Sequence, residues 1–234
     1  MKKLFVIVTL LLITTTLGFA QKGYYLEQKV TTSSVMGQPA KEFISKNWIL
    51  DNRFRSESDE QITIFRFDLK KVWMINTQKK QYNEMSMDEM RQMAQMGHAM
   101  MQNVEGVNFK FRKTGRTKKI NQWNCYEVAS DVKMMKQSIW LTEDLPFGKD
   151  VYYNFYKEMP EFRDLAESIY KSEELNGYPV LSETEINMMG MKIQSSSELI
   201  TIREEKIDSG LFDLPGGLEK VANPLEMLNE AEYE

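Results

Sequence analysis

The sequence predicts a mainly β protein of the α+β class, built on one antiparallel sheet of roughly ten strands with two or three helices. Three observations lead to this prediction. Short runs that alternate apolar with polar residues, rich in aromatic and β-branched side chains, recur along the chain. Polar turns too short for parallel crossovers separate these runs. Two longer segments, 86–102 and 150–172, instead show helical spacing of their apolar residues.

The first 20 residues predict a cleaved secretory signal. Lys2 and Lys3 precede an apolar run over 4–13, and small residues stand at Gly18 and Ala20. The alternative is a membrane anchor, but the run is shorter than the roughly 20 residues that a spanning helix needs. The expected division is a signal peptide 1–20, a single domain 21–221 and an acidic tail 222–234. The expected location, after cleavage near Ala20, is the periplasm or the exterior.

The composition of the mature chain argues against nucleic acid as a partner and excludes an internal disulfide. Removing residues 1–20 from the 234 leaves 214 residues, enough for one domain with a substantial core. Without Lys2 and Lys3, 28 basic side chains face 34 acidic ones, a net charge of −6 that argues against nucleic acid. No other segment is long and apolar enough to span a membrane. The only cysteine, Cys125, cannot form an internal disulfide, and we expect a packed thiol.

The first third of the mature chain predicts an antiparallel meander. Asp51 and Asn52 form a turn pair between two of its strands. The predicted strands are 24–32, 43–50, 54–58, 62–67, 72–75 and 81–85, with further turns at 68–71 and 77–80.

A methionine-rich helix is predicted next, over 86–102. Ser86 and Glu89 have capping-box spacing, in which each side chain accepts a hydrogen bond from the other residue's backbone N–H. At 100° per residue, one face of this helix is nearly all methionine. It comprises Met90, Met93, Ala94, Gly97, Met100 and Met101, with Met87 and Met96 at its border.

Three interpretations of this methionine face stay open. It is ordinary core, or it offers a pliable apolar surface to a ligand, since unbranched thioethers repack around variable shapes. Alternatively, thioethers bind Cu(I), and the ligands would be Met90, Met93, Met96 and Met100. His98 falls on the polar side of the helix, which counts against copper.

The middle of the chain predicts further strands and a strongly basic hairpin. Strands are expected at 107–112, through Ile120 after a turn at 114–116, then at 123–129 and 137–142. The basic side chains of the hairpin are Lys110, Arg112, Lys113, Arg116, Lys118 and Lys119. They would contact anionic lipid headgroups or an acidic partner, or would only keep a strand edge soluble.

The second helical region, 150–172, begins with an aromatic cluster. Tyr152, Phe155 and Tyr156 either pack this segment on the sheet or line a cavity mouth. Strands over 178–186 and 194–207, a turn at 188–191 and a closing loop at 211–217 complete the domain.

No catalytic residues are identified. One histidine and one cysteine exclude zinc sites that need several such ligands. The sequence has no nucleophile elbow, phosphate-binding glycine loop or dinucleotide fingerprint. We therefore expect a protein that is not an enzyme and needs no cofactor.

Three stretches resemble the DUF4412 family of exported bacterial proteins, which is related to the LolA-like lipoprotein carriers. They are the hairpin 65–82, the segment 139–148, and the end formed by 176–180 with 211–217. The resemblance implies a LolA-like fold: a curved antiparallel sheet, or incomplete β-barrel, with helices packed on its concave face. By analogy it implies a lipid ligand.

The sequence-based hypothesis is thus binding of a hydrophobic molecule, a lipid or acyl chain, in the cell envelope. The residues expected to contact it are Met87, Met90, Met93, Met96, Met100, Met101, Tyr152, Phe155 and Tyr156. The alternatives are a Cu(I)-binding periplasmic protein, and a structural module that binds an envelope protein.

Overall fold

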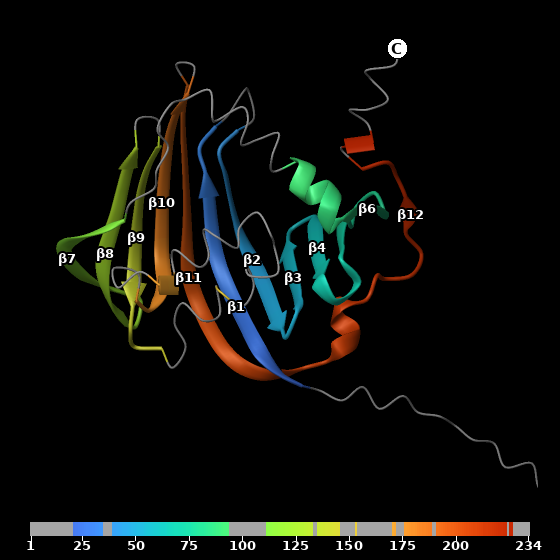
Figure 1. The fold of residues 1–234 in the computed structure, drawn as a ribbon, viewed down its shortest axis with the longest axis horizontal. Helices are drawn as coiled ribbons and strands as arrows, with labels where there is room; N and C mark the ends of the chain where they lie inside the picture. The colour runs from blue at the N-terminus through green and yellow to red at the C-terminus, as the bar shows by residue number, and fades with distance from the viewer. Residues whose placement is uncertain are drawn as a thin grey trace, which may run out of the picture.

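The computed structural model describes residues 21–34, 39–93, 111–132, 135–145, 153, 170–171, 176–188, 191–223 and 225–226. These residues form one 12-stranded sheet in the order β12-β6-β5-β4-β3-β2-β1-β11-β10-β9-β8-β7 (Figure 1). The end strands β12 and β7 do not pair with each other, so the sheet is open. This confirms the mainly β class and the incomplete barrel, with two strands more than the ten expected.

One half of the sheet is the predicted meander. Its strands are β1 (Gln21–Thr32), β2 (Lys41–Leu50), β3 (Arg53–Ser58), β4 (Gln61–Arg66), β5 (Lys71–Asn76) and β6 (Gln81–Ser86). The 3-10 helix η1 (Phe67–Leu69) joins β4 to β5. Asp51, Lys70 and Lys80 adopt positive φ angles of 50°, 53° and 54° in the tight connections, as the predicted turns require.

The other half contains β7 (Arg112–Ile120), β8 (Trp123–Val132), β9 (Met135–Thr142), β10 (Tyr178–Met188) and β11 (Met191–Ile207). The turn predicted at 114–116 is wrong. These residues lie within β7, as an irregularity between Lys113 and Thr117 where Gly115 has a φ of 79°. The part of the predicted strand over 107–110 lies outside the described residues.

Strand β11 connects the two halves because its 17 residues pair with β10 and then with β1. After it come η3 (Ser209–Phe212) and the two-residue β12 (Glu219–Lys220), which pairs parallel to β6. All other strand pairs are antiparallel.

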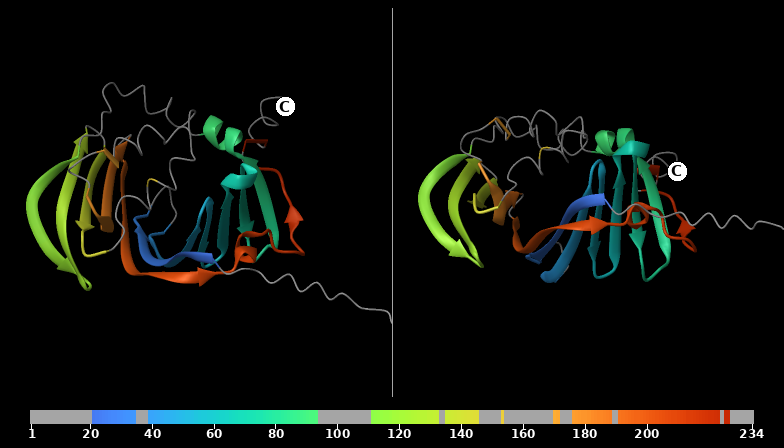
Figure 2. Two further views of the ribbon diagram at one scale, coloured as in Figure 1. Left: turned by 60° about the horizontal axis from the view of Figure 1, so that its bottom comes forward. Right: turned by 90° about the horizontal axis from the view of Figure 1, so that it is seen from below.

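The sheet is bent into an open trough (Figure 2). The bend is sharp at the β7 end, where the Asn121 amide in the β7–β8 turn donates to the Leu199 carbonyl of β11 at 3.0 Å. Around this bend lies a core of Leu26, Ile120, Trp123, Cys125, Trp140, Tyr178, Val180 and Leu199. A second core, under η3, comprises Leu50, Ile64, Trp73, Ile75, Ile207 and Phe212. Cys125 is buried in the first core, as predicted.

The described residues show fewer helices than the two or three expected. The described residues contain one helix, 87–93, which lies at the open side of the trough near β4–β6 (Figure 2). The remainder of the predicted helix 86–102 lies outside them, and so do residues 150–172 apart from Tyr153, Tyr170 and Lys171, which are helical. Within the part of the chain that the structure describes, no helix combines the length and apolarity needed to cross a membrane.

Candidate functional site

A row of apolar side chains crosses β1–β6. Cross-strand pairing places Tyr24 opposite Ile49, Ile49 opposite Phe54, and Phe54 opposite Phe65. The row continues from Phe65 to Val72 and Met85. Directly paired residues share one face of a sheet, so these six side chains form a continuous band, here called the apolar row. The second core uses the alternate residues of the same strands, so the apolar row lies on the opposite face from η3.

The aromatic members of the apolar row are half-buried and packed together. The ring centroids of Phe54 and Phe65 lie 5.8 Å apart, edge to face. Phe67, in η1, stacks on Phe65 at the same centroid distance. Val72 and Met85 are buried, so the row is most tightly covered at its β5–β6 end.

The methionine helix begins at this covered end. The Met87 backbone N–H donates to the Lys70 carbonyl at 3.0 Å. The capping box is confirmed: Ser86 N–H donates to Glu89 Oε2 at 2.6 Å, and Glu89 N–H donates to Ser86 Oγ at 3.1 Å. These bonds lower the pKa of the Glu89 carboxyl, with the backbone N–H of Ser86 as the largest cause. The start of the helix is therefore fixed relative to the sheet.

Asn223 fastens the same helix start from the other end of the chain. Its Nδ2 donates to the Glu84 carbonyl at 3.1 Å and to Glu89 Oε1 at 3.0 Å. Its Oδ1 accepts from the backbone N–H groups of Leu225 and Glu226, both at 3.0 Å. One buried amide thus joins the cap of the methionine helix to a second cap near the C-terminus.

The predicted methionine surface is described only at its beginning. Met87 is buried, Met90 is half-buried and Met93 is exposed. The other residues predicted to contact an apolar ligand lie outside the described residues: Met96, Met100, Met101, Tyr152, Phe155 and Tyr156. The same holds for His98 and for two of the four proposed Cu(I) ligands, Met96 and Met100. These assignments therefore stay predictions.

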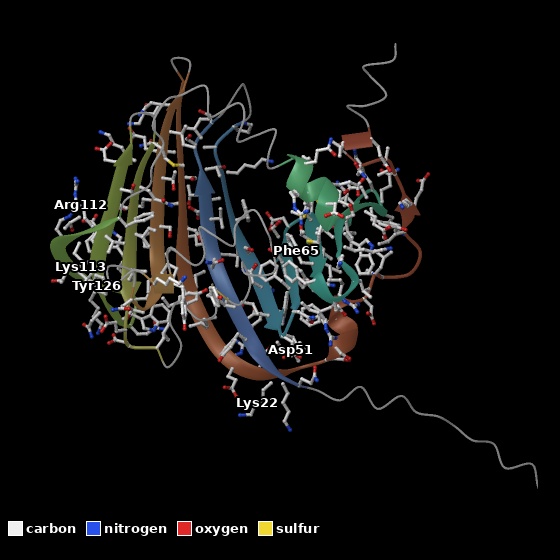
Figure 3. All side chains as sticks on the ribbon, in the orientation of Figure 1. Lys22, Asp51, Phe65, Arg112, Lys113 and Tyr126 are labelled. Atoms are coloured by element: carbon white, nitrogen blue, oxygen red, sulfur yellow. The ribbon has the colours of Figure 1, made fainter. Side chains whose placement is uncertain are left out.

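The basic side chains predicted in the hairpin lie along β7, except Lys110, which is outside the described residues. Several contact aromatic rings of the neighbouring strands. Lys113 Nζ lies 4.9 Å from the ring centroid of Tyr126, and Lys118 Nζ lies 4.0 Å from that of Trp140. Figure 3 shows Arg112, Lys113 and Tyr126 gathered at β7 and β8, while Phe65 lies in the other half of the molecule.

A buried carboxylate, which the sequence did not reveal, lies next to β7. Glu127, on β8, is only 1% exposed. It accepts hydrogen bonds from Ser138 Oγ at 2.6 Å, from Thr114 Oγ1 at 2.5 Å, and from the Arg116 guanidinium. A signal was present in the sequence, because alternation places Glu127 on the same face as Trp123 and Cys125, where a charged residue is unexpected.

Opposing effects set the pKa of the Glu127 carboxyl. Burial raises it, because removal from water disfavours the charged form. The hydrogen bonds from Ser138, Thr114 and Arg116, with the positive charge of Arg116, outweigh burial and hold the pKa below its usual value. Glu127 is therefore an ionised, fully bonded group at neutral pH.

A polar groove of about 650 Å³ opens beside Glu127. It lies between β7–β11 and the end of β1, and Arg112 and Arg116 line it. Its other charged lining residues are Glu127, Asp131, Lys136, Glu183 and Glu185, so three cations face four acids. Hydroxyl and amide side chains supply most of the remaining surface, and no methionine contributes to it.

Comparisons with known proteins give one family match. The model of the family "Domain of unknown function (DUF4412)" matches residues 36–218. No curated protein matches the chain.

Among solved structures, the similar chains share little sequence with this protein. A PNGF-II structure is 12% identical with a TM-score of 0.36, and the match covers 91% of this chain but 33% of PNGF-II. MucB in complex with MucA(peri) is 8% identical with a TM-score of 0.42, covering 88% of this chain and 59% of the other. A putative outer membrane lipoprotein-sorting protein domain from Vibrio parahaemolyticus is 7% identical with a TM-score of 0.34, covering 82% and 89%. This chain therefore spans about a third of the PNGF-II chain.

Proposed function

This chain belongs to the DUF4412 family, and from that premise we propose that it is a non-enzymatic envelope protein that binds a lipid or acyl chain. The binding surface is the apolar row together with the methionine helix that begins beside it. The observation that carries this proposal is the band of six directly paired apolar side chains across β1–β6. A ligand chain laid along this band would be desolvated by one side chain from each strand.

The position of the methionine helix supports the same proposal. Hydrogen bonds from Met87 and Asn223 hold its first turn at the β5–β6 end of the row. The residues that follow carry the flexible thioethers, which adapt to apolar chains of different shape. A fixed helix start, together with thioether side chains that can repack, suits a surface that accepts related ligands.

The envelope location rests on the N-terminal signal pattern. Cleavage near Ala20 releases a chain that begins at Gln21, the first residue of β1. N-terminal sequencing of the protein from a periplasmic fraction tests this part of the proposal. A start at Met1 would contradict it.

Native mass spectrometry of the purified protein, followed by titration with a fluorescent fatty acid, tests ligand binding. We expect lipid to copurify, and Phe65→Ala to weaken uptake of the probe about tenfold because it opens the middle of the apolar row. Ile44→Ala is the matched control, since Ile44 is an exposed apolar residue of β2 outside the row. Absence of both copurifying lipid and probe uptake would overturn the proposal.

A further inference from the structure

The polar groove calls for a ligand different from the one proposed for the apolar row. Only two of its lining side chains, Ala40 and Ala129, are apolar. Eight of the others are serine or threonine, and alternation places Thr31, Ser138 and Ser196 among them on the same face of the sheet as Glu127. A surface of this composition offers hydrogen bonds in place of apolar area. Its volume of about 650 Å³ falls within the range of small-molecule sites, about 300–1,000 Å³.

The charges that remain available in the groove are balanced. Glu127 forms an ion pair with Arg116, and Glu185 forms one with Lys192 at 2.9 Å. Arg112, Lys136, Asp131 and Glu183 form no ion pair within the described residues. Two cations and two acids suit an uncharged ligand better than an anionic headgroup, whose charge the two acids would repel.

The backbone around the groove is poorly suited to binding an extended peptide. Strands β8, β9, β10 and β11 each have a neighbour on both sides, so their main-chain N–H and C=O groups are used within the sheet. A peptide would therefore find neither free main-chain partners nor apolar pockets on these strands. Recognition must use side-chain hydroxyl, amide and carboxylate groups.

We propose that the polar groove binds a neutral oligosaccharide. Neighbouring hydroxyls of a sugar both donate and accept, which matches a lining of hydroxyls, the amide of Gln194, and the carboxylates of Asp131 and Glu183. This inference does not depend on lipid binding, because the groove and the apolar row share no residue.

A glycan array probed with the protein expressed from the full-length chain tests the proposal. Isothermal titration with maltotetraose, cellotetraose and chitotetraose follows, together with the best glycan from the array. We expect at least one glycan to bind with a Kd below about 1 mM. Glu183→Gln should weaken that binding about tenfold or more, because it removes a charged acceptor. Glu204→Gln, an exposed acid of β11 outside the groove, should leave it unchanged.

Asp131→Asn, at the second carboxylate of the groove, should also weaken glycan binding about tenfold or more. No glycan bound anywhere on the array, binding that ignores both groove variants, or capture of Ser/Thr-rich peptides in place of glycans would each overturn the proposal. Fatty acid uptake should be unaffected by Glu183→Gln. Failure of the glycan proposal can therefore be distinguished from failure of the lipid proposal.

Discussion

The two halves of this sheet differ in how much of their surface is covered by other parts of the chain. At β2–β5, η3 and the loop after it cover one face, and the buried Arg55 donates to the Leu211 carbonyl at 2.8 Å. Arg66 donates to the Asp213 carboxylate at 2.8 Å. At β7–β9, by contrast, the edge strand is exposed along nearly its whole length, and the buried side chains include the ionised Glu127.

The two halves of one continuous sheet are therefore expected to be stabilised in different ways. Apolar packing under η3 stabilises the β2–β6 half, and the opposite face of these strands carries the apolar row. In the β7–β11 half, the first apolar core is supplemented by the hydrogen bonds and ion pair of Glu127, which respond to pH and salt. The predictions below test whether the two halves depend on these different forces.

The largest effect is expected in the apolar half, from Ile64→Ala. Ile64 is 0% exposed within the core under η3, so truncation leaves a cavity that costs about 2–5 kcal/mol of unfolding free energy. Urea denaturation measures it. The control Ile44→Ala, at a side chain 39% exposed, should cost less than about 1 kcal/mol. Equal losses for the two variants would show that η3 does not seal a core.

A smaller effect, of about 2 kcal/mol at neutral pH, is expected for Glu127→Gln in the polar half. The substitution keeps the shape and an acceptor but removes the charge that Arg116, Thr114 and Ser138 stabilise. Glu198→Gln, at an acid that bonds the exposed Asn121, is the control and should cost little. Denaturation at high salt should shrink the Glu127 effect more than the Ile64 effect.

The Glu127 effect should also depend on pH in a defined direction. Its folded-state pKa is lowered, so its contribution is fully present above the unfolded-state pKa of about 4.3. That contribution is lost as the pH falls through the folded-state value. The stabilities of the natural protein and Glu127→Gln should therefore converge in acid. A gap that stays constant to low pH would mean that Glu127 is not ionised in the folded protein.

The sequence predicted best what depends on neighbours along the chain. The capping box of Ser86 and Glu89 spans three residues, and the Asp51–Asn52 turn spans two, so local chemistry decides both. Alternation similarly predicted most strands. The DUF4412 resemblance, drawn from three stretches, was confirmed by the family match.

What the sequence did not reveal depends on partners that the fold brings together. Glu127 is bonded from β7 and β9, and Asn223 reaches a helix cap 134 residues earlier in the sequence. The polar groove combines residues from Thr31 to Ser196, none of which forms a local motif. The turn expected at 114–116 became part of β7 because pairing with β8 continues on both sides of Gly115.

Asn223→Ala tests the connection between the C-terminus and the methionine helix. The substitution removes four hydrogen bonds of one buried amide, and a cost of about 2 kcal/mol is expected. Thermal unfolding followed by circular dichroism measures the loss. Asn187→Ala, which removes an exposed amide, should change stability by less than about 0.5 kcal/mol. A neutral Asn223→Ala would show that the C-terminal segment does not hold the helix.

The smallest effect is expected for Ser86→Ala, which removes one side of the capping box. Loss of the acceptor for Glu89 N–H should cost about 1 kcal/mol, and Ser86→Asn should restore most of it because asparagine also caps well. Hydrogen exchange distinguishes a local from a global loss. Because Asn223 and the Met87–Lys70 bond still hold the helix start, exchange should quicken over 87–93 and stay unchanged in β8–β10. If exchange rose equally throughout the sheet, the methionine helix would be part of the folding core. It could then not move independently of the sheet to adapt to a ligand.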